Sequence, residues 1–141
     1  MMQQVIVERG ILVALVDRSD RYHAWVVEQL KQIAPPMLTC EAVVSESCFL
    51  LQRARNGLSS LLRLLDAGQV IVQFDLANEM AAVLDLLKRY QSVPASLADA
   101  ELVRMSELYP NSSVFTLDSD FQIYRKDRDV AIPLIIPPAG T

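Results

Sequence analysis

Short runs of apolar residues recur along the chain, separated by longer segments with apolar residues at helical spacing. The runs are continuous rather than alternating, which is typical of strands buried on both faces. They lie at residues 5–7 (VIV), 37–39 (MLT), 69–74 (QVIVQF), 114–117 (VFTL) and 132–136 (IPLII). Pro133 lies inside the last run and has no backbone donor, so we expect that strand at a sheet edge.

The segments between these runs carry helix start and stop residues. Ser19 or Asp20 is expected to cap a helix that ends before Pro35 and Pro36, and Ser96 is expected to cap another. The predicted helices cover residues 10–16, 20–34, 41–54, 58–65 and 97–109, and a further helix capped by Asp75 or Asn78 runs to about Tyr90. Alternating strands and helices predict an α/β fold, a three-layer α/β/α sandwich with a central, mostly parallel sheet.

Length and composition narrow the class of protein. The 141 residues, 52% of them hydrophobic, predict a single domain over residues 1–141. No run of about 18 apolar residues predicts a membrane span, and the N-terminal segment lacks a secretory signal pattern, so we expect a cytoplasmic protein without a membrane partner. One histidine excludes any zinc site that needs two imidazoles, and two cysteines suggest reduced thiols. A net charge of −4 excludes a polycation but leaves room for a local basic patch.

Acidic residues follow two of the predicted strands. Glu8 follows the first strand and Asp118 follows VFTL, with Asp120 close by. The carboxyl ends of parallel strands share one edge of a sheet, where ligands bind, so these acids should meet.

Two further acids are predicted to face the packed interior. Glu46 has only apolar neighbours one turn away on its helix: Ala42, Val43, Phe49 and Leu50. Asp99 lies beside Val103 and Ser106 on the packed side of its helix, whereas Glu101, Arg104 and Glu107 are expected on its outer face. A carboxylate on an apolar face is costly unless it is paired or bound to a cation.

Together these acids predict a metal site. Clustered carboxylates repel one another, and oxygen ligands without histidine or cysteine favour Mg²⁺ or Mn²⁺. Such ions support phosphodiester cleavage by an activated water. Simpler roles stay open for each acid taken alone: Asp99 as a helix-start acid, Asp118 and Asp120 as turn residues, and Glu46 as an ion-pair partner of Arg53 or Arg55.

Four stretches of the chain resemble the PIN-domain ribonucleases, especially the VapC-type toxins of bacterial toxin–antitoxin pairs. They are VIVERGILVALVDRSDRYHAW, TCEAVVSESCFLL, SLADAELVRMSE and FTLDSDFQIYR, which span most of the sequence. The resemblance implies a parallel sheet sandwiched by helices. It also implies that Glu8, Glu46, Asp99 and Asp118 are catalytic acids that bind Mg²⁺ or Mn²⁺, with Asp120 as an auxiliary metal ligand. Thr116 occupies a small hydroxyl position beside Asp118 and is assigned, with Arg9, Arg53 and Arg55, to substrate binding.

The first of these motifs departs from the family pattern. The family usually has Asp-Thr-Gly or Asp-Ser after its first strand, where this chain has Glu8, Arg9 and Gly10. Glu8 keeps the charge on a longer side chain, and Arg9 brings a cation. Arg9 could contact a substrate phosphate, or it could pair with Glu8 or Asp118 and occupy the place of the metal.

The resulting hypothesis is a metal-dependent endoribonuclease, the toxin of a toxin–antitoxin pair. The resemblance implies an RNA substrate, an antitoxin partner and a homodimer. The alternative is a catalytically impaired PIN-like module that binds RNA or a protein. A phosphoacceptor receiver domain also clusters acids at strand ends, but it needs a lysine after its last strand, and IPLIIPPAGT has none.

Overall fold

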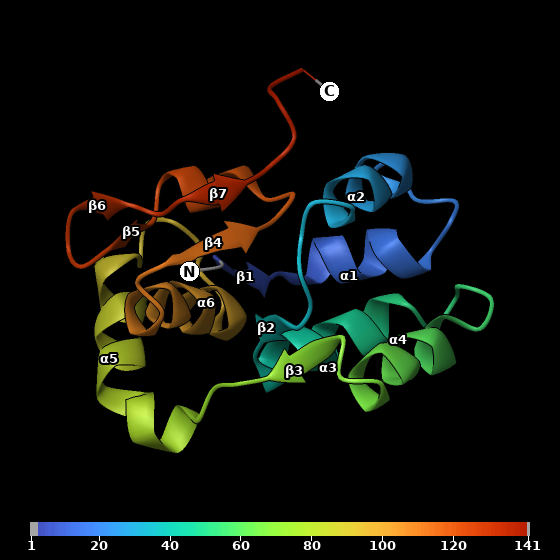
Figure 1. The fold of residues 1–141 in the computed structure, drawn as a ribbon. Helices are drawn as coiled ribbons and strands as arrows, with labels where there is room; N and C mark the ends of the chain where they lie inside the picture. Colours follow the sequence, from blue (N-terminus) through green and yellow to red (C-terminus); the bar gives the residue numbers. More distant parts are fainter. Residues whose placement is uncertain (1–2, 141) are drawn as a thin grey trace.

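The computed structural model describes residues 3–140 and contains a five-stranded sheet flanked by helices (Figure 1). All neighbouring strands of this sheet are parallel, in the order β3-β2-β1-β4-β7. Its strands are β1 (Gln4–Val7), β2 (Met37–Thr39), β3 (Val70–Val72), β4 (Ser112–Phe115) and β7 (Leu134–Ile135). The predicted α/β sandwich with a central parallel sheet is therefore confirmed.

Helices fill the connections between the strands. They are α1 (Arg9–Val16), α2 (His23–Leu30), α3 (Glu41–Leu50), α4 (Gly57–Asp66), α5 (Leu76–Arg89) and α6 (Leu97–Leu108). Helix α6 packs on β1 and β4, and α5 packs on α6, while α1 contacts α2, α3 and α4. No helix within residues 3–140 has the length and apolar character needed to cross a membrane.

The strand order places β1 and β4 side by side at the point where that order reverses. The chain moves from β1 outward to β2 and β3, and then returns to place β4 on the opposite side of β1. In parallel sheets, the point where the order reverses leaves a crevice at the carboxyl ends of the two strands. The register Val7↔Phe115 aligns those ends, so the residues that follow, Glu8 and Thr116, emerge side by side.

The core is continuous across both faces of the sheet. Ile6, Val7, Val114 and Phe115 are fully or almost fully buried, which explains the apolar runs in the sequence. Trp25 packs against Phe115 with ring centroids 5.7 Å apart, and the His23 ring bonds the Ala14 carbonyl, so both serve packing of α2. Cys40 is buried and Cys48 half-buried, and neither forms a disulfide.

Several predicted boundaries are corrected by the structure. Helix α2 ends at Leu30 rather than Ala34, and α3 ends at Leu50, so Arg53 and Arg55 lie in the turns beyond it. Strand β4 starts two residues before the predicted VFTL run and ends at Phe115. The 3₁₀ helix η1 (Ser119–Gln122) and the antiparallel pair β5 (Arg125–Lys126) and β6 (Val130–Ala131) were not predicted. The short strand β7 does lie at the sheet edge, as Pro133 required.

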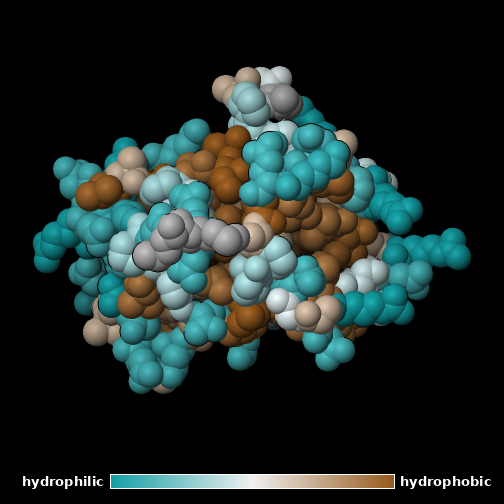
Figure 2. All heavy atoms as spheres, in the orientation of Figure 1, coloured by the Kyte–Doolittle hydropathy of each residue, from teal (hydrophilic) through white to brown (hydrophobic). Residues whose placement is uncertain are grey.

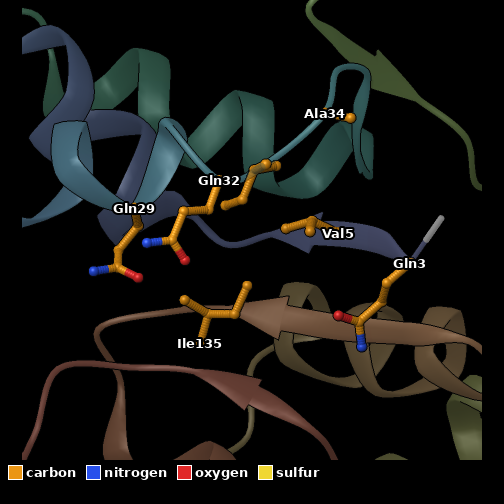
Figure 3. Close-up of a pocket in the computed structure, with 7 residues that line it drawn as sticks. Gln3, Val5, Gln29, Gln32, Ala34 and Ile135 are labelled. Atoms are coloured by element: carbon orange, nitrogen blue, oxygen red, sulfur yellow. The ribbon is translucent and has the colours of Figure 1, made fainter.

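Two hollows lie away from the acidic residues. Figure 2 shows apolar side chains gathered between α2 and α4, where Leu15, Leu30, Ile33, Met37 and Leu64 line a groove. A second cavity of about 310 Å³ opens near the start of β1 (Figure 3). Its polar lining consists of the Gln3, Gln29 and Gln32 amides, at the opposite end of β1 from Glu8. Neither hollow carries an acid, so neither is a candidate for the metal chemistry.

Candidate active site

Glu8 is the buried centre of the candidate site. It follows β1, caps the start of α1 and is 6% exposed. Its side chain lies over the first turn of α1, and a Cβ added to Gly10 would come within 3.1 Å of Glu8 Oε1, so a glycine suits this approach. Burial raises the pKa of the Glu8 carboxyl, and the charge of Asp118 adds to the rise, while hydrogen bonds from Gly10 and Thr116 oppose it.

Thr116 connects the two acids that follow β1 and β4. Its buried hydroxyl donates to Glu8 Oε1 at 3.0 Å and accepts a hydrogen bond from the Asp118 backbone N–H at 2.9 Å. The Asp118 side chain in turn accepts from the Asp120 N–H at 2.9 Å. The hydroxyl therefore fixes where the Glu8 carboxylate and the start of the Asp118 turn lie. Its predicted contact with substrate stays a prediction.

We expect Thr116→Val to destabilise the protein by about 1–3 kcal/mol, because it removes a buried hydroxyl that serves both a carboxylate and a backbone N–H. Thr116→Ser keeps the hydroxyl and should recover most of the loss. Urea unfolding at pH 7 in EDTA measures both changes. A Val variant as stable as the native chain would show that these two bonds do not hold the site.

Asp99 joins the site from the start of α6. Its backbone N–H donates to Ser96 Oγ, and its Oδ2 accepts from the Ser96 N–H, a reciprocal capping box with both distances 3.0 Å. Burial raises the pKa of the Asp99 carboxyl, and the Asp118 charge adds to the rise. Asp99 is thus both a helix-capping residue and a member of an acidic cluster.

The cluster extends to Asp120 and Tyr124. The Asp118 charge is the main cause that raises the pKa of the Asp120 carboxyl, and Asp99 contributes. The Tyr124 hydroxyl lies 3.4 Å from Asp99 Oδ2, and burial together with the charges of Asp99, Asp120 and Asp118 raises its pKa. Tyr124 therefore stays protonated and can donate to Asp99. Sequence reasoning missed Tyr124, because a tyrosine in FQIYR carries no spacing signal of its own.

Glu46 is held by Arg9. Arg9 Nη1 lies 3.1 Å from Glu46 Oε1, and Arg9 Nε lies 3.9 Å from Glu8 Oε2. The charge of Asp99 also acts on Arg9. The ion-pair partner of Glu46 is thus Arg9 and not Arg53 or Arg55, and Arg9 pairs with Glu8 rather than Asp118. The guanidinium stands among the acids, although 42% of its side chain is exposed to solvent.

The donor chemistry fits a hard divalent cation, since every acid of the cluster offers carboxylate oxygen. The charge of Asp118 raises the pKa of the Glu8, Asp99 and Asp120 carboxyls, so these three acids lie within its electrostatic reach. In the arrangement seen here, however, no group of three or more acid, histidine or cysteine side chains within residues 3–140 is close enough to hold a metal ion. Arg9 is the cation that faces the cluster.

Glu101 corrects another expectation. It was predicted on the outer face of α6 but is 3% exposed, because α6 is covered by the sheet, α3 and α5 together. Its neighbours Arg104 and Glu107 do form a partly exposed ion pair. Burial raises the pKa of the Glu101 carboxyl, with smaller effects from Glu41 and Glu46.

We expect Glu101→Gln to stabilise the chain by about 1 kcal/mol at pH 7, the low end of the cost of burying an unpaired polar group. A raised carboxyl pKa means that wild-type stability falls as the pH rises above the ordinary value of 4.5. The gain should therefore vanish below about pH 4, where Glu101 is protonated in the folded and unfolded states. Urea unfolding at both pH values in EDTA, with the exposed Glu28→Gln as control, tests this. A destabilised Gln variant at pH 7 would contradict it.

Comparison with known proteins identifies the family. The family model described as the PIN domain matches residues 5–127. The chain belongs to the PIN-domain family. Among solved structures, it is similar to the sarcin–ricin loop cleaving toxin VapC20 of Mycobacterium tuberculosis, with a TM-score of 0.76 and 18% identity over 85% of this chain and 94% of that one. A search of curated proteins returned no match. The PIN match covers β1, α3, α6 and β4, the elements that carry or precede Glu8, Glu46, Asp99 and Asp118.

Proposed function

We propose that this PIN-domain protein is a metal-dependent endoribonuclease that cleaves RNA phosphodiester bonds. The observation that supports the proposal most is the acidic cluster formed by three distant parts of the sequence, in which the charge of Asp118 raises the pKa of both the Glu8 and the Asp99 carboxyl and Thr116 links Glu8 to the Asp118 backbone. The cluster lies where the strand order reverses, in a chain that belongs to the PIN-domain family. Repulsion between carboxylates at this place destabilises the folded chain unless a cation or a bound substrate group offsets their negative charge.

Glu8, Glu46, Asp99 and Asp118 are the residues that would hold Mg²⁺ or Mn²⁺, with Asp120 beside them. When bound, such an ion neutralises the acids, polarises a phosphoryl oxygen and makes a water more acidic. The chain's own groups prepare the site for it. Thr116 orients the Glu8 carboxylate, the capping box holds Asp99, and the protonated Tyr124 hydroxyl can donate to Asp99. Arg9, Arg53 and Arg55 are proposed to contact the RNA backbone.

The biological role proposed is that of a toxin in a toxin–antitoxin pair, in the cytoplasm. It is supported by the fold shared with VapC20, a toxin that cleaves the sarcin–ricin loop. An antitoxin protein and a second copy of this chain are the partners that this role requires. The identity of 18% supports a common fold and leaves the RNA target of this chain open.

A second candidate is a catalytically impaired PIN module that binds RNA or a protein. The Arg9–Glu46 ion pair favours it, because an arginine already neutralises an acid expected to bind the metal. The double variant Glu8→Asp/Arg9→Thr restores the usual family residues and separates the two candidates. RNA cleavage that appears only in the double variant would identify the native chain as a binder.

The proposal is tested by incubating the purified chain with 5′-labelled single-stranded RNA in Mn²⁺, in Mg²⁺ and in EDTA. We expect discrete fragments with either metal and intact RNA in EDTA. Intact RNA under all three conditions, from a chain whose folding is confirmed by circular dichroism, would contradict the endoribonuclease assignment.

A further inference from the structure

Phe49 is the most exposed large apolar side chain in the described part of the molecule, at 69%. It lies on α3, three positions after Glu46, and it is absent from the side chains that pack against the core. Packing therefore does not explain a phenyl ring at this position. A ring held in solvent on a helix offers a flat face to a ligand.

The surroundings of Phe49 are chemically mixed. A hollow of about 530 Å³ is lined by Arg9, Ser45, Glu46, Phe49 and Leu50. It therefore combines a ring, an aliphatic side chain, a hydroxyl, a carboxylate and a guanidinium. Arg9 and Glu46 are shared with the acidic site, so the hollow borders that site. Stacking faces beside hydrogen-bonding groups suit a nucleobase.

A basic hollow lies further along the same segment. This hollow of about 620 Å³ is lined by Arg18, Arg53 and Arg55 together with one acid, Asp17, so its lining keeps an excess of positive charge. Arg53 follows Phe49 by four residues. None of the three arginines forms an ion pair with a carboxylate in the part of the chain from residue 3 to residue 140. Unpaired guanidinium groups lining a hollow are suited to phosphate.

We propose that Phe49 is a nucleobase-stacking platform for single-stranded RNA that runs from the acidic site along α3 to the arginine hollow. The inference rests on the proposed nuclease function and adds a binding subsite to it. Aromatic side chains stack bases of any identity, and a basic track beside them follows the backbone. The order along α3 and the following turns matches a strand that passes from the scissile phosphate to a base and on to further phosphates.

A protein surface is the other kind of partner that an exposed phenylalanine could meet. The three unpaired arginines and the shared Arg9 favour RNA, because they complement a polyanion on both sides of the ring. Self-association through Phe49 is therefore treated as an outcome of the test.

Binding of a fluorescein-labelled, mixed-sequence single-stranded RNA is measured by anisotropy in EDTA, so that no cleavage occurs. The variants are Phe49→Leu, which keeps an apolar side chain without the ring, Phe49→Trp, which keeps a stacking face, and Leu62→Ala, an exposed apolar control on α4. We expect Phe49→Leu to weaken binding roughly fivefold or more. Phe49→Trp and Leu62→Ala should bind as the native chain does. Arg53→Ala should also lower the slope of log affinity against log salt concentration by about one, the effect of losing one phosphate contact.

If the native chain binds RNA and Phe49→Leu binds it equally well, the stacking platform is overturned and the nuclease proposal stays intact. Failure of the native chain to bind or cleave any RNA would instead reject the proposed function together with the inference. Sedimentation of the native chain and Phe49→Leu distinguishes the remaining case. A change in oligomeric state on removing the ring would assign Phe49 to a protein interface and overturn the RNA platform.

Discussion

Replacing Asp99 with asparagine should lower the rate of Mn²⁺-dependent RNA cleavage on the order of 100-fold or more. Asp99 brings the α6 contribution to the acidic cluster, and the amide loses the charge that a hard cation requires. The asparagine oxygen can still accept from the Ser96 N–H, so the start of α6 should form normally. The expected loss is therefore one of chemistry and not of folding.

Single-turnover cleavage of labelled RNA, with circular dichroism and urea unfolding of each variant, measures this effect. Asp66→Asn, at the exposed end of α4, is the matched control and should cleave as the native chain does. A native-like rate for Asp99→Asn would remove Asp99 from the catalytic machinery. A folded but inactive Asp66→Asn would show that the assay responds to surface charge and not to the site.

Replacing Arg9 with threonine should tighten Mn²⁺ binding roughly tenfold. The Arg9–Glu46 pair must give way before Glu46 can bind a metal, and a partly exposed ion pair contributes up to about 1 kcal/mol. The guanidinium charge also repels an approaching dication. Both effects disappear with a threonine, because its side chain is short and uncharged.

Titration calorimetry with Mn²⁺ measures the affinity of Arg9→Thr against the native chain. Arg63→Thr, which removes an arginine in the last turn of α4, controls for net charge and should leave the affinity unchanged. Equal affinity of the native chain and Arg9→Thr would show that the ion pair does not compete with the metal. A much weaker RNA complex in the same variant would assign Arg9 to substrate phosphate instead.

The fold and the family were predictable because strand burial and strand ends leave direct marks in the sequence. The continuous runs around Ile6 and Val114 indicated a parallel sheet, and the rule on strand ends led to Glu8 and Asp118. Ser96 and Asp99 marked the start of α6 by their capping pattern. Each of these signals lies within a few consecutive residues, so it can be recognised in a single sequence.

Partners across the fold were harder to predict. The sequence suggested Arg53 or Arg55 beside Glu46, but Arg9 reaches it, because α1 and α3 pack side by side. Glu101 seemed exposed because helical spacing identifies one apolar face, whereas α6 is packed on several sides. Tyr124 comes to Asp99 through the turn after η1, which has no apolar periodicity to predict it.

The most direct test of the proposed metal site is to measure the affinity of the chain for the cation. Titration of the native chain and Asp99→Asn with Mn²⁺ by calorimetry, without RNA, isolates that step from cleavage. The acidic cluster predicts saturable binding to the native chain and a loss of most of the affinity in Asp99→Asn. Equal titrations of the two chains, or no binding to either the native chain or Arg9→Thr, would contradict a metal centre at these carboxylates.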